Sequence, residues 1–160
     1  MKFDNFFHFK EHIVDEIQKL LHSAVRGMKN ITYVVVHVRR TDYIGYLKSK
    51  FNATPVKPDY FVRQMNVFRN KYQRVMFVVV SDHPKWCERE LRGDDVVVMK
   101  TNSPAQDLAI MAACNHSIID YGTYGVWGAL LSGGDTFVYN LTNSGAFVLA
   151  SLLPNWYIVT

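Results

Sequence analysis

The sequence predicts an α/β fold, a Rossmann-like parallel sheet with helices on both faces. Short segments rich in β-branched residues alternate steadily with amphipathic segments along the chain. The apolar segments Tyr33–Val38 and Val75–Val80 carry valine at successive positions, which is typical of strands that are covered on both faces. Prolines open three of the expected helices, and proline is favoured in the first helical turn. Together these features favour a parallel sheet between two helical layers.

The spacing of apolar residues places each element in turn. A helix is expected over about Phe7–Arg26, where Gly27 ends the periodic pattern. The segment after Val38 is rich in Gly, Lys and Asn, and we expect a loop there. Further helices are expected at 58–72, 84–91, 104–115 and 124–131, and further strands at 75–80, 95–99, 117–120 and 135–139. From Asn143 onward the chain is expected to be irregular, with about one helical turn.

Length and composition limit the class of protein. A chain of 160 residues that is 49% hydrophobic and 20% charged favours one folded domain over disorder. The formal net charge is +4, but no run of five Lys or Arg residues occurs, so a bound phosphate explains the excess as well as nucleic acid does. Neither a Walker-type phosphate loop nor a GxGxxG motif is present, which removes the main support for ATPase and nicotinamide-dependent activities.

Two further patterns bear on the compartment of the protein. Cys87 and Cys114 are too few for a metal cluster, and we expect buried free thiols, with a disulfide as the alternative. No apolar run reaches the about 18 residues of a membrane span, and no signal peptide is visible. Four glycosylation triplets nevertheless favour a lumenal origin. Asn52 is expected in a polar loop and Asn115 inside the fold.

Charged side chains follow the first predicted strand without an intervening turn. His37, Arg39, Arg40 and Asp42 lie at its carboxyl end, the edge at which such sheets bind ligands. Arginine offers paired N–H donors to phosphate, so this cluster predicts an anion site. Asp42 would hold one guanidinium in position or act as a base. The alternative is a surface ion pair, with His37 as an ordinary core histidine.

Two other strand ends carry similar polar groups. Ser81 and Asp82 follow the second strand, where Asp82 either accepts from a purine or ribose or caps the helix that begins at Pro84. The segment Asp120–Gly125 connects a strand to a helix, and its glycines allow a ligand to approach the backbone. A plain tight turn is the alternative for this segment. With the arginines, these ends predict a site for a nucleotide diphosphate.

These same stretches resemble the galactoside α-1,2-fucosyltransferase family. The stretch His37–Tyr43, HVRRTDY, is similar to the HxRRxDY motif, which α-1,6- and protein O-fucosyltransferases share in looser form. The pair Ser81–Asp82 with Trp86 resembles a second block on the donor side of the family. The stretch Ser103–Asp135 resembles the longest and most specific signature of the family.

The resemblance implies the C-terminal donor lobe of a GT-B glycosyltransferase. Such an enzyme would transfer L-fucose from GDP-fucose to the 2-hydroxyl of a terminal galactoside with inversion, without a cofactor or metal and without a nucleic-acid partner. Arg39 would hold the β-phosphate with the support of Arg40 and Asp42. The residues expected to bind GDP-fucose are His37, Arg39, Arg40, Ser81, Asp82, Gly122, Thr123 and Tyr124, and the expected catalytic residues are Arg39 and Asp42.

The resemblance also bears on domains and on competing functions. Residues 31–160 would form the GDP-fucose-binding domain, and residues 1–30 a helix that remains from, or links to, a largely absent first lobe. Members of the family are typically anchored in the Golgi membrane, although no anchor is visible in this chain. Val126 and Trp127 follow Gly125, where the family commonly has two aromatic residues. The alternatives are a non-catalytic GDP-sugar-binding fragment, or a fucosyltransferase that acts on protein or on core glycan.

Overall fold

A single parallel sheet forms the centre of the protein. The computed structural model describes residues 8–25, 28–101 and 103–160. The strands are β1 (Thr32–Val38), β2 (Val75–Ser81), β3 (Val96–Val98), β4 (His116–Ile119), β5 (Thr136–Tyr139) and β6 (Trp156–Val159). Their order across the sheet is β3-β2-β1-β4-β5-β6, and all neighbours are parallel. The order reverses between β1 and β4, so the switch point lies in the middle of the sheet.

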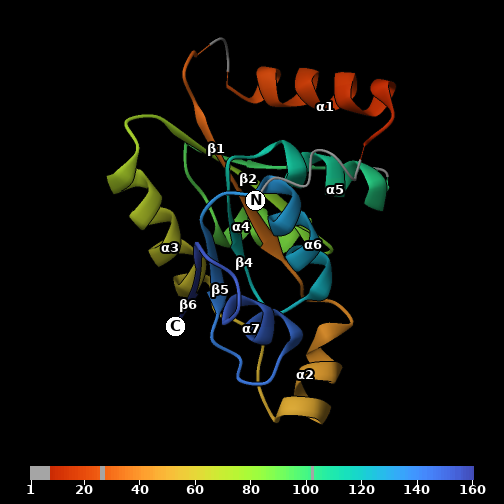
Figure 1. Ribbon diagram of the computed structural model, residues 1–160, viewed down its shortest axis with the longest axis vertical. Coiled ribbons are helices and arrows are strands. Elements are labelled where there is room, and N and C mark those ends of the chain that lie inside the picture. The colour runs from red at the N-terminus through yellow and green to blue at the C-terminus, as the bar shows by residue number, and fades with distance from the viewer. Residues whose placement is uncertain (1–7, 26–27, 102) are drawn as a thin grey trace.

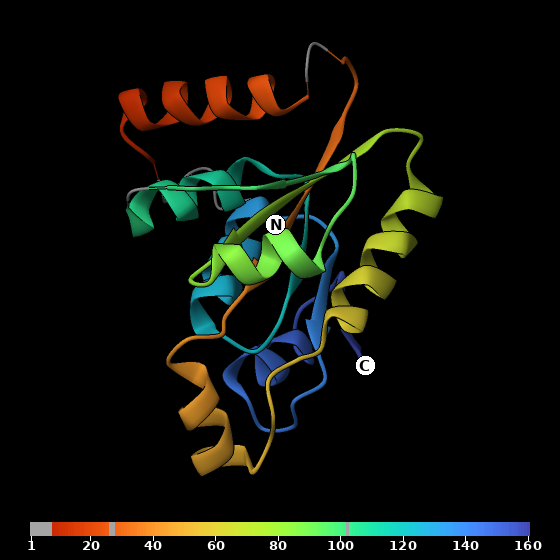
Figure 2. The same ribbon diagram turned by 180° about the vertical axis from the view of Figure 1, so that it is seen from behind.

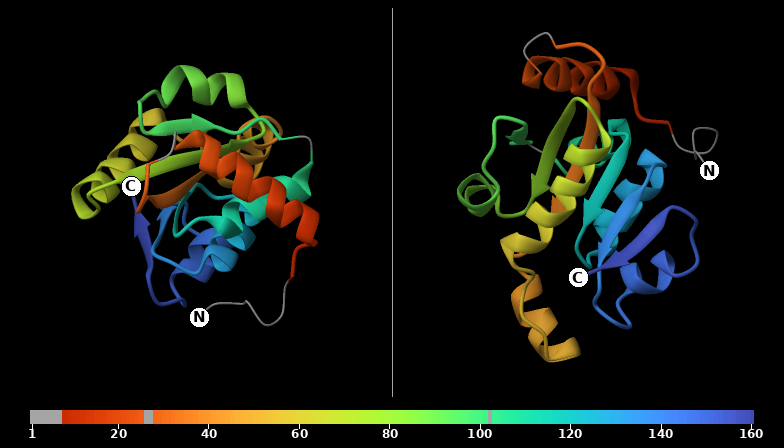
Figure 3. Two further views of the ribbon diagram at one scale, coloured as in Figure 1. Left: turned by 90° about the horizontal axis from the view of Figure 1, so that it is seen from above. Right: turned by 90° about the vertical axis from the view of Figure 1, so that its left-hand side faces the viewer.

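Helices cover both faces of this sheet (Figure 3). One face packs against α3 (Pro58–Lys71) and α4 (Pro84–Glu90). The other packs against α1 (Glu11–Ala24), α5 (Pro104–Ala113), α6 (Thr123–Ser132) and α7 (Gly145–Ala150). A further helix, α2 (Tyr43–Phe51), lies at the opposite end of the molecule from α1 (Figures 1 and 2). None of the helices in the described part of the chain combines the length and apolar character that a membrane span requires.

The valine-rich strands explain why two helical layers form. Val34 and Val36 of β1 face α3 and α4, whereas Val35 between them faces α1 and α5. All three side chains are completely buried. A strand whose residues are apolar at odd and even positions can release water on both faces, which drives helices onto each side. The predicted Rossmann-like parallel sheet with helices on both faces is therefore confirmed.

The structure corrects the prediction in two places. The segment after Val38 is not all loop, because α2 begins at Tyr43, directly after the charged motif. Gly45, Lys48, Ser49 and Lys50 interrupt its apolar residues, and only Leu47 of this helix is buried. The chain after Asn143 is not irregular, since it forms α7 and then β6 at the sheet edge. The predicted first helix is present as α1, while its predicted ends at Phe7 and Arg26 lie outside the described residues.

The cysteines lie on opposite sides of the sheet. Cys87 packs with the α3 and α4 layer, and Cys114 packs with the α1 and α5 layer. Both are buried free thiols, so the expectation of free thiols is confirmed and the disulfide alternative is wrong. Burial raises the pKa of Cys87 to about 11, and it raises the pKa of Cys114 further. Both thiols therefore stay protonated at neutral pH.

The expectation for one glycosylation triplet was also wrong. Asn115 is exposed rather than inside the fold, although its side-chain oxygen accepts a hydrogen bond from the Tyr33 backbone N–H at 2.8 Å. Asn52 is exposed as expected, but it ends α2 in the left-handed conformation, with φ 48°, instead of lying in a long loop. Both side chains are thus at the surface, and the difference between them is that Asn115 holds the start of β1.

Tyr60 supplies a test of how the α3 layer is fixed to the sheet. Its hydroxyl is buried and donates to the Ile119 carbonyl at 2.8 Å, at the carboxyl end of β4. Tyr60→Phe should lower the free energy of unfolding by about 1–2 kcal/mol, because it removes the donor and leaves a buried carbonyl less satisfied. Urea unfolding measures this loss. The control is Tyr157→Phe on the exposed face of β6, and equal losses in the two variants would contradict the assignment.

Candidate functional site

A pocket of about 370 Å³ lies at the carboxyl ends of the central strands. It is built from the ends of β1 and β2, the turn before α6, and the start of α5. Its lining residues are His37, Arg39, Tyr43, Val80, Ser81, Asp82, Pro104, Asp107, Gly122, Thr123 and Tyr124. The structure thus brings together seven of the nine residues predicted for the site. Arg40 and Asp42 are not among the lining residues.

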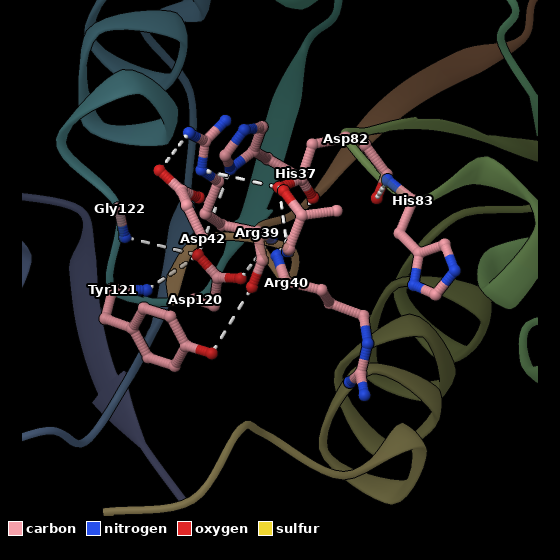
Figure 4. Close-up of polar contacts among 11 residues, drawn as sticks. His37, Arg39, Arg40, Asp42, Asp82, His83, Asp120, Tyr121 and Gly122 are labelled. Carbon is pink, nitrogen blue, oxygen red and sulfur yellow. Dashed lines mark hydrogen bonds and ion pairs between the residues drawn. The ribbon is translucent and has the colours of Figure 1, made fainter. Parts of the chain in front are cut away.

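Arg39 is held between two carboxylates at the edge of this pocket (Figure 4). Its Nη2 donates to Asp42 Oδ2 at 2.8 Å, and its Nε lies 3.5 Å from Asp82 Oδ2. Its guanidinium also lies 5.7 Å from the centre of the Tyr43 ring. Burial alone would lower the pKa of Arg39, but the hydrogen bond to Asp42 and the charge of Asp82 raise it overall. Arg39 is therefore a permanently charged group in a fixed position.

Arg40 points away from the pocket and packs against α4. Its guanidinium carbon lies 4.0 Å from the centre of the Trp86 ring, and Nη1 donates to the Val56 carbonyl at 3.4 Å. Its Nε is buried and has no hydrogen-bond partner. Neighbouring residues of an extended chain point to opposite sides, which explains why the two arginines separate. Asp42 accordingly pairs with Arg39 and not with Arg40.

Asp82 is engaged by the segment that leaves β1. Oδ1 accepts from the Arg40 backbone N–H and Oδ2 from the Thr41 N–H, each at 2.9 Å, and the Thr41 hydroxyl also donates to Oδ2. Burial raises the pKa of Asp82, but these hydrogen bonds and the charge of Arg39 lower it overall. The N-cap of α4 is His83, so the alternative that Asp82 caps this helix is wrong. Ser81 Oγ accepts instead from the His83 N–H at 3.0 Å.

His37 forms the floor of the pocket. It is only 3% exposed, and its Nδ1 has no hydrogen-bond partner. Its ring lies 5.7 Å from that of Tyr124, and a Cβ at Gly125 would lie 2.6 Å from Nδ1. Burial lowers the pKa of His37 to about 4, although the charge of Asp82 opposes this shift. His37 is therefore neutral at pH 7, and residue 125 must be glycine for the ring to lie there.

The turn from β4 to α6 completes the wall opposite β2. Asp120 is buried, and its carboxylate accepts from the backbone N–H groups of Arg39 at 2.6 Å, Tyr121 at 2.7 Å and Gly122 at 3.2 Å. Burial raises the pKa of Asp120 to about 7 against the opposing effect of these hydrogen bonds. The helix α6 then begins at Thr123, and the first-turn N–H groups of a helix have no partner within it. These groups can bind an anion beside Arg39.

Sequence reasoning missed four lining residues: Tyr43, Val80, Pro104 and Asp107. Asp107 lies in the first turn of α5, where the Thr101 hydroxyl donates to it, and burial raises its pKa overall. The Tyr124 hydroxyl donates to the Pro104 carbonyl and so joins α6 to α5 across the pocket. The position of Asp107 three residues after a helix-opening proline was the one available signal. Among the described residues, no group of three or more potential metal ligands is gathered.

Curated relatives share the sequence of most of the chain. Galactoside alpha-(1,2)-fucosyltransferase 2 of Rattus norvegicus is 35% identical over 165 residues, which cover 94% of this chain and 46% of that protein. Galactoside 2-alpha-L-fucosyltransferase Sec1 of Mus musculus is 36% identical, with 94% of this chain and 44% of that protein covered. The chain therefore spans about half the length of these relatives.

A solved structure shows the likeness in fold, and a family model shows the family. The crystal structure of POFUT1 in complex with GDP superposes with a TM-score of 0.57 over 79% of this chain and 44% of that chain, at 11% identity. This likeness concerns the fold, and it agrees with the GT-B lobe that the sequence predicted. The model for glycosyl transferase family 11 matches residues 1–160. Together with the fucosyltransferase relatives, this match shows that the chain belongs to glycosyl transferase family 11.

Proposed function

We propose that this chain binds GDP-fucose and is the donor-binding part of an enzyme that transfers L-fucose to the 2-hydroxyl of a terminal galactoside. The observation that carries the proposal is Arg39, fixed by Asp42 and Asp82 beside the start of α6 in the pocket at the sheet's switch point. The names of the curated relatives supply the fucosyl group and the galactoside acceptor. By the same analogy, the protein would work in the Golgi.

The charges at the site fit a diphosphate without a metal. Arg39 offers a planar fork of N–H groups, and the first turn of α6 offers backbone N–H groups with a partial positive charge. The two lie close together, because a Cβ built on Gly122 would lie 3.6 Å from Arg39 Cβ. Gly122, Thr123 and Tyr124 would therefore border the pyrophosphate. We propose that these groups replace the divalent cation that many other sugar-nucleotide enzymes use.

The proposed reaction is an inverting displacement at the anomeric carbon of fucose. The galactoside 2-hydroxyl attacks this carbon, the bond to the β-phosphate oxygen breaks, and GDP leaves with the bonding electrons. Negative charge grows on the β-phosphate, so a fixed Arg39 stabilises the transition state more than the ground state. Asp42 would keep Arg39 in place. The other possible role of Asp42, as the base that takes the hydroxyl proton, stays a hypothesis.

The remaining predicted residues would serve the nucleoside. His37 is neutral at pH 7, so it can form a hydrogen bond with the base or ribose without adding charge. Most of the acceptor capacity of Asp82 is used by Arg40 and Thr41, so its proposed place near the guanine is indirect. Arg40 would support the site from outside through Trp86.

The first prediction concerns GDP itself. The purified chain should bind GDP, weakly, in calorimetric titration, and EDTA or added Mg²⁺ should leave the affinity unchanged. The physical reason is that Arg39 and the start of α6 supply the counter-charge. An absolute requirement for a divalent metal would contradict the assignment. GDP binding without fucose transfer to any galactoside would favour a non-catalytic fragment, and transfer to protein or core glycan would favour the other alternative.

The second prediction separates the two arginines. Arg39→Lys should weaken GDP binding by about tenfold, because lysine keeps the charge but loses the paired N–H donors. The matched control is Arg40→Lys, which should keep most of the affinity but lower thermal stability, since it loses the stacking on Trp86. Calorimetry and thermal unfolding measure the two effects. An Arg39→Lys variant with unchanged fold and wild-type affinity would show that the arginine pair is only structural.

A further inference from the structure

Asp120 is a buried carboxylate for which the proposed reaction has no direct use. It lies at the carboxyl end of β4 and is 1% exposed. It is not among the residues that line the pocket, although it precedes the turn that does. Burying a charge costs free energy, and burial raises its pKa to about 7. A position on the surface would avoid this cost, so the contacts of Asp120 need an explanation.

These contacts join the two halves of the anion site. Oδ2 accepts from the Arg39 backbone N–H at 2.6 Å, across 81 residues of sequence. Oδ1 accepts from the N–H groups of Tyr121 and Gly122, the two residues that lead into α6. One oxygen thus holds the end of β1, and the other holds the turn that sets where α6 begins (Figure 4). A neutral amide has a single acceptor oxygen and could serve only one of these sides.

The backbone hydrogen bonds between β1 and β4 do not extend as far as Arg39. The last paired residues of β1 and β4 are His37 and Ile119, so the ladder between these strands ends before Arg39. Beyond that point the separation of Arg39 from the α6 turn depends on Asp120, on the Tyr121 hydroxyl, which donates to the Arg39 carbonyl at 3.3 Å, and on the packing of Arg39 against Gly122. Among these contacts, the buried Asp120 carboxylate is the one that binds the Arg39 backbone N–H and the backbone of the turn at the same time.

We propose that Asp120 is a positioning residue of the diphosphate site, and that its carboxylate holds the Arg39 backbone and the start of α6 at a fixed separation so that both contact one ligand. This inference rests on the proposed function. Asp120 acts through Arg39 and the turn, and it does not touch the nucleotide. Its role is distinct from that of Asp42, which contacts the guanidinium itself.

The test compares isosteric amide variants. Asp120→Asn should weaken GDP binding by roughly tenfold to a hundredfold in calorimetry, since a small misplacement of binding groups is costly. Asp135→Asn is the matched control. This carboxylate accepts from Lys71 at 2.6 Å, but it directly precedes β5 and so lies at the amino ends of the strands, away from the pocket. The control should bind GDP as the wild type does.

A double variant distinguishes positioning from a general loss of structure. In the Arg39→Lys background, Asp120→Asn should cost much less than it does in the wild type, because coupled residues are not additive. Equal GDP affinity in wild type and Asp120→Asn, or fully additive effects with the fold intact, would overturn the inference.

Amide NMR spectra of the wild type remain decisive where Asp120→Asn fails to fold or where GDP fails to bind. The Arg39, Tyr121 and Gly122 amide signals should shift together with one midpoint as Asp120 titrates, since all three donate to its carboxylate. Independent titration of these signals would contradict the proposed link. Absence of GDP binding with a common midpoint would instead overturn the proposed function and leave the link intact.

Discussion

The site depends on how β1 continues beyond the sheet. Three successive backbone N–H groups, those of Arg39, Arg40 and Thr41, donate to carboxylates from the neighbouring strands. Asp120 after β4 takes the first, and Asp82 after β2 takes the other two. A strand that loses its partners needs other acceptors for its N–H groups, and here two side chains replace the missing ladder. Arg39 and Arg40 are therefore held in place before the chain turns into α2 at Tyr43.

This arrangement explains why two adjacent arginines have different roles. Because the backbone stays extended, their side chains leave on opposite sides. Arg39 reaches the pocket, where carboxylates fix it, while Arg40 lies flat against Trp86 and joins β1 to α4. One side chain presents its charge in the pocket, and the other supplies packing. Asp42 and Asp82 offset the charge of the Arg39 guanidinium.

The sequence predicted the parts of the protein that depend on local patterns. The valine runs predicted the central strands, because burial on both faces leaves no polar position. Polar residues at or after the strand ends, such as His37, Ser81 and Gly122, were predicted to meet at one edge of the sheet, because parallel strands present their carboxyl ends together. The resemblance to a known family supplied the predicted donor, acceptor and reaction. These inferences needed only neighbours in sequence and a known topology.

The rest depended on contacts between distant residues. No local sequence pattern indicates that Asp82 accepts hydrogen bonds from the segment after β1, or that His83 is the N-cap of α4. Asp120 was read as part of a turn, because its main partner lies 81 residues away. The helix α2 fully buries a single residue, Leu47, while Tyr43 and Phe51 at helical spacing are only partly buried against the core. Each of these features is decided by tertiary packing, which pattern reasoning does not see.

The missing side chain at Gly125 sets a limit on how this pocket can change. A Cβ there would come within 2.6 Å of His37 Nδ1, so even alanine would force the imidazole to move. The place of the His37 ring in the pocket thus depends on one helix position that is not itself among the lining residues. A chain of this family that accepted a larger residue at 125 would need a smaller one at 37 in compensation. A larger side chain in α6 at position 125 would then require a paired change in β1, since the single substitution would meet a steric barrier.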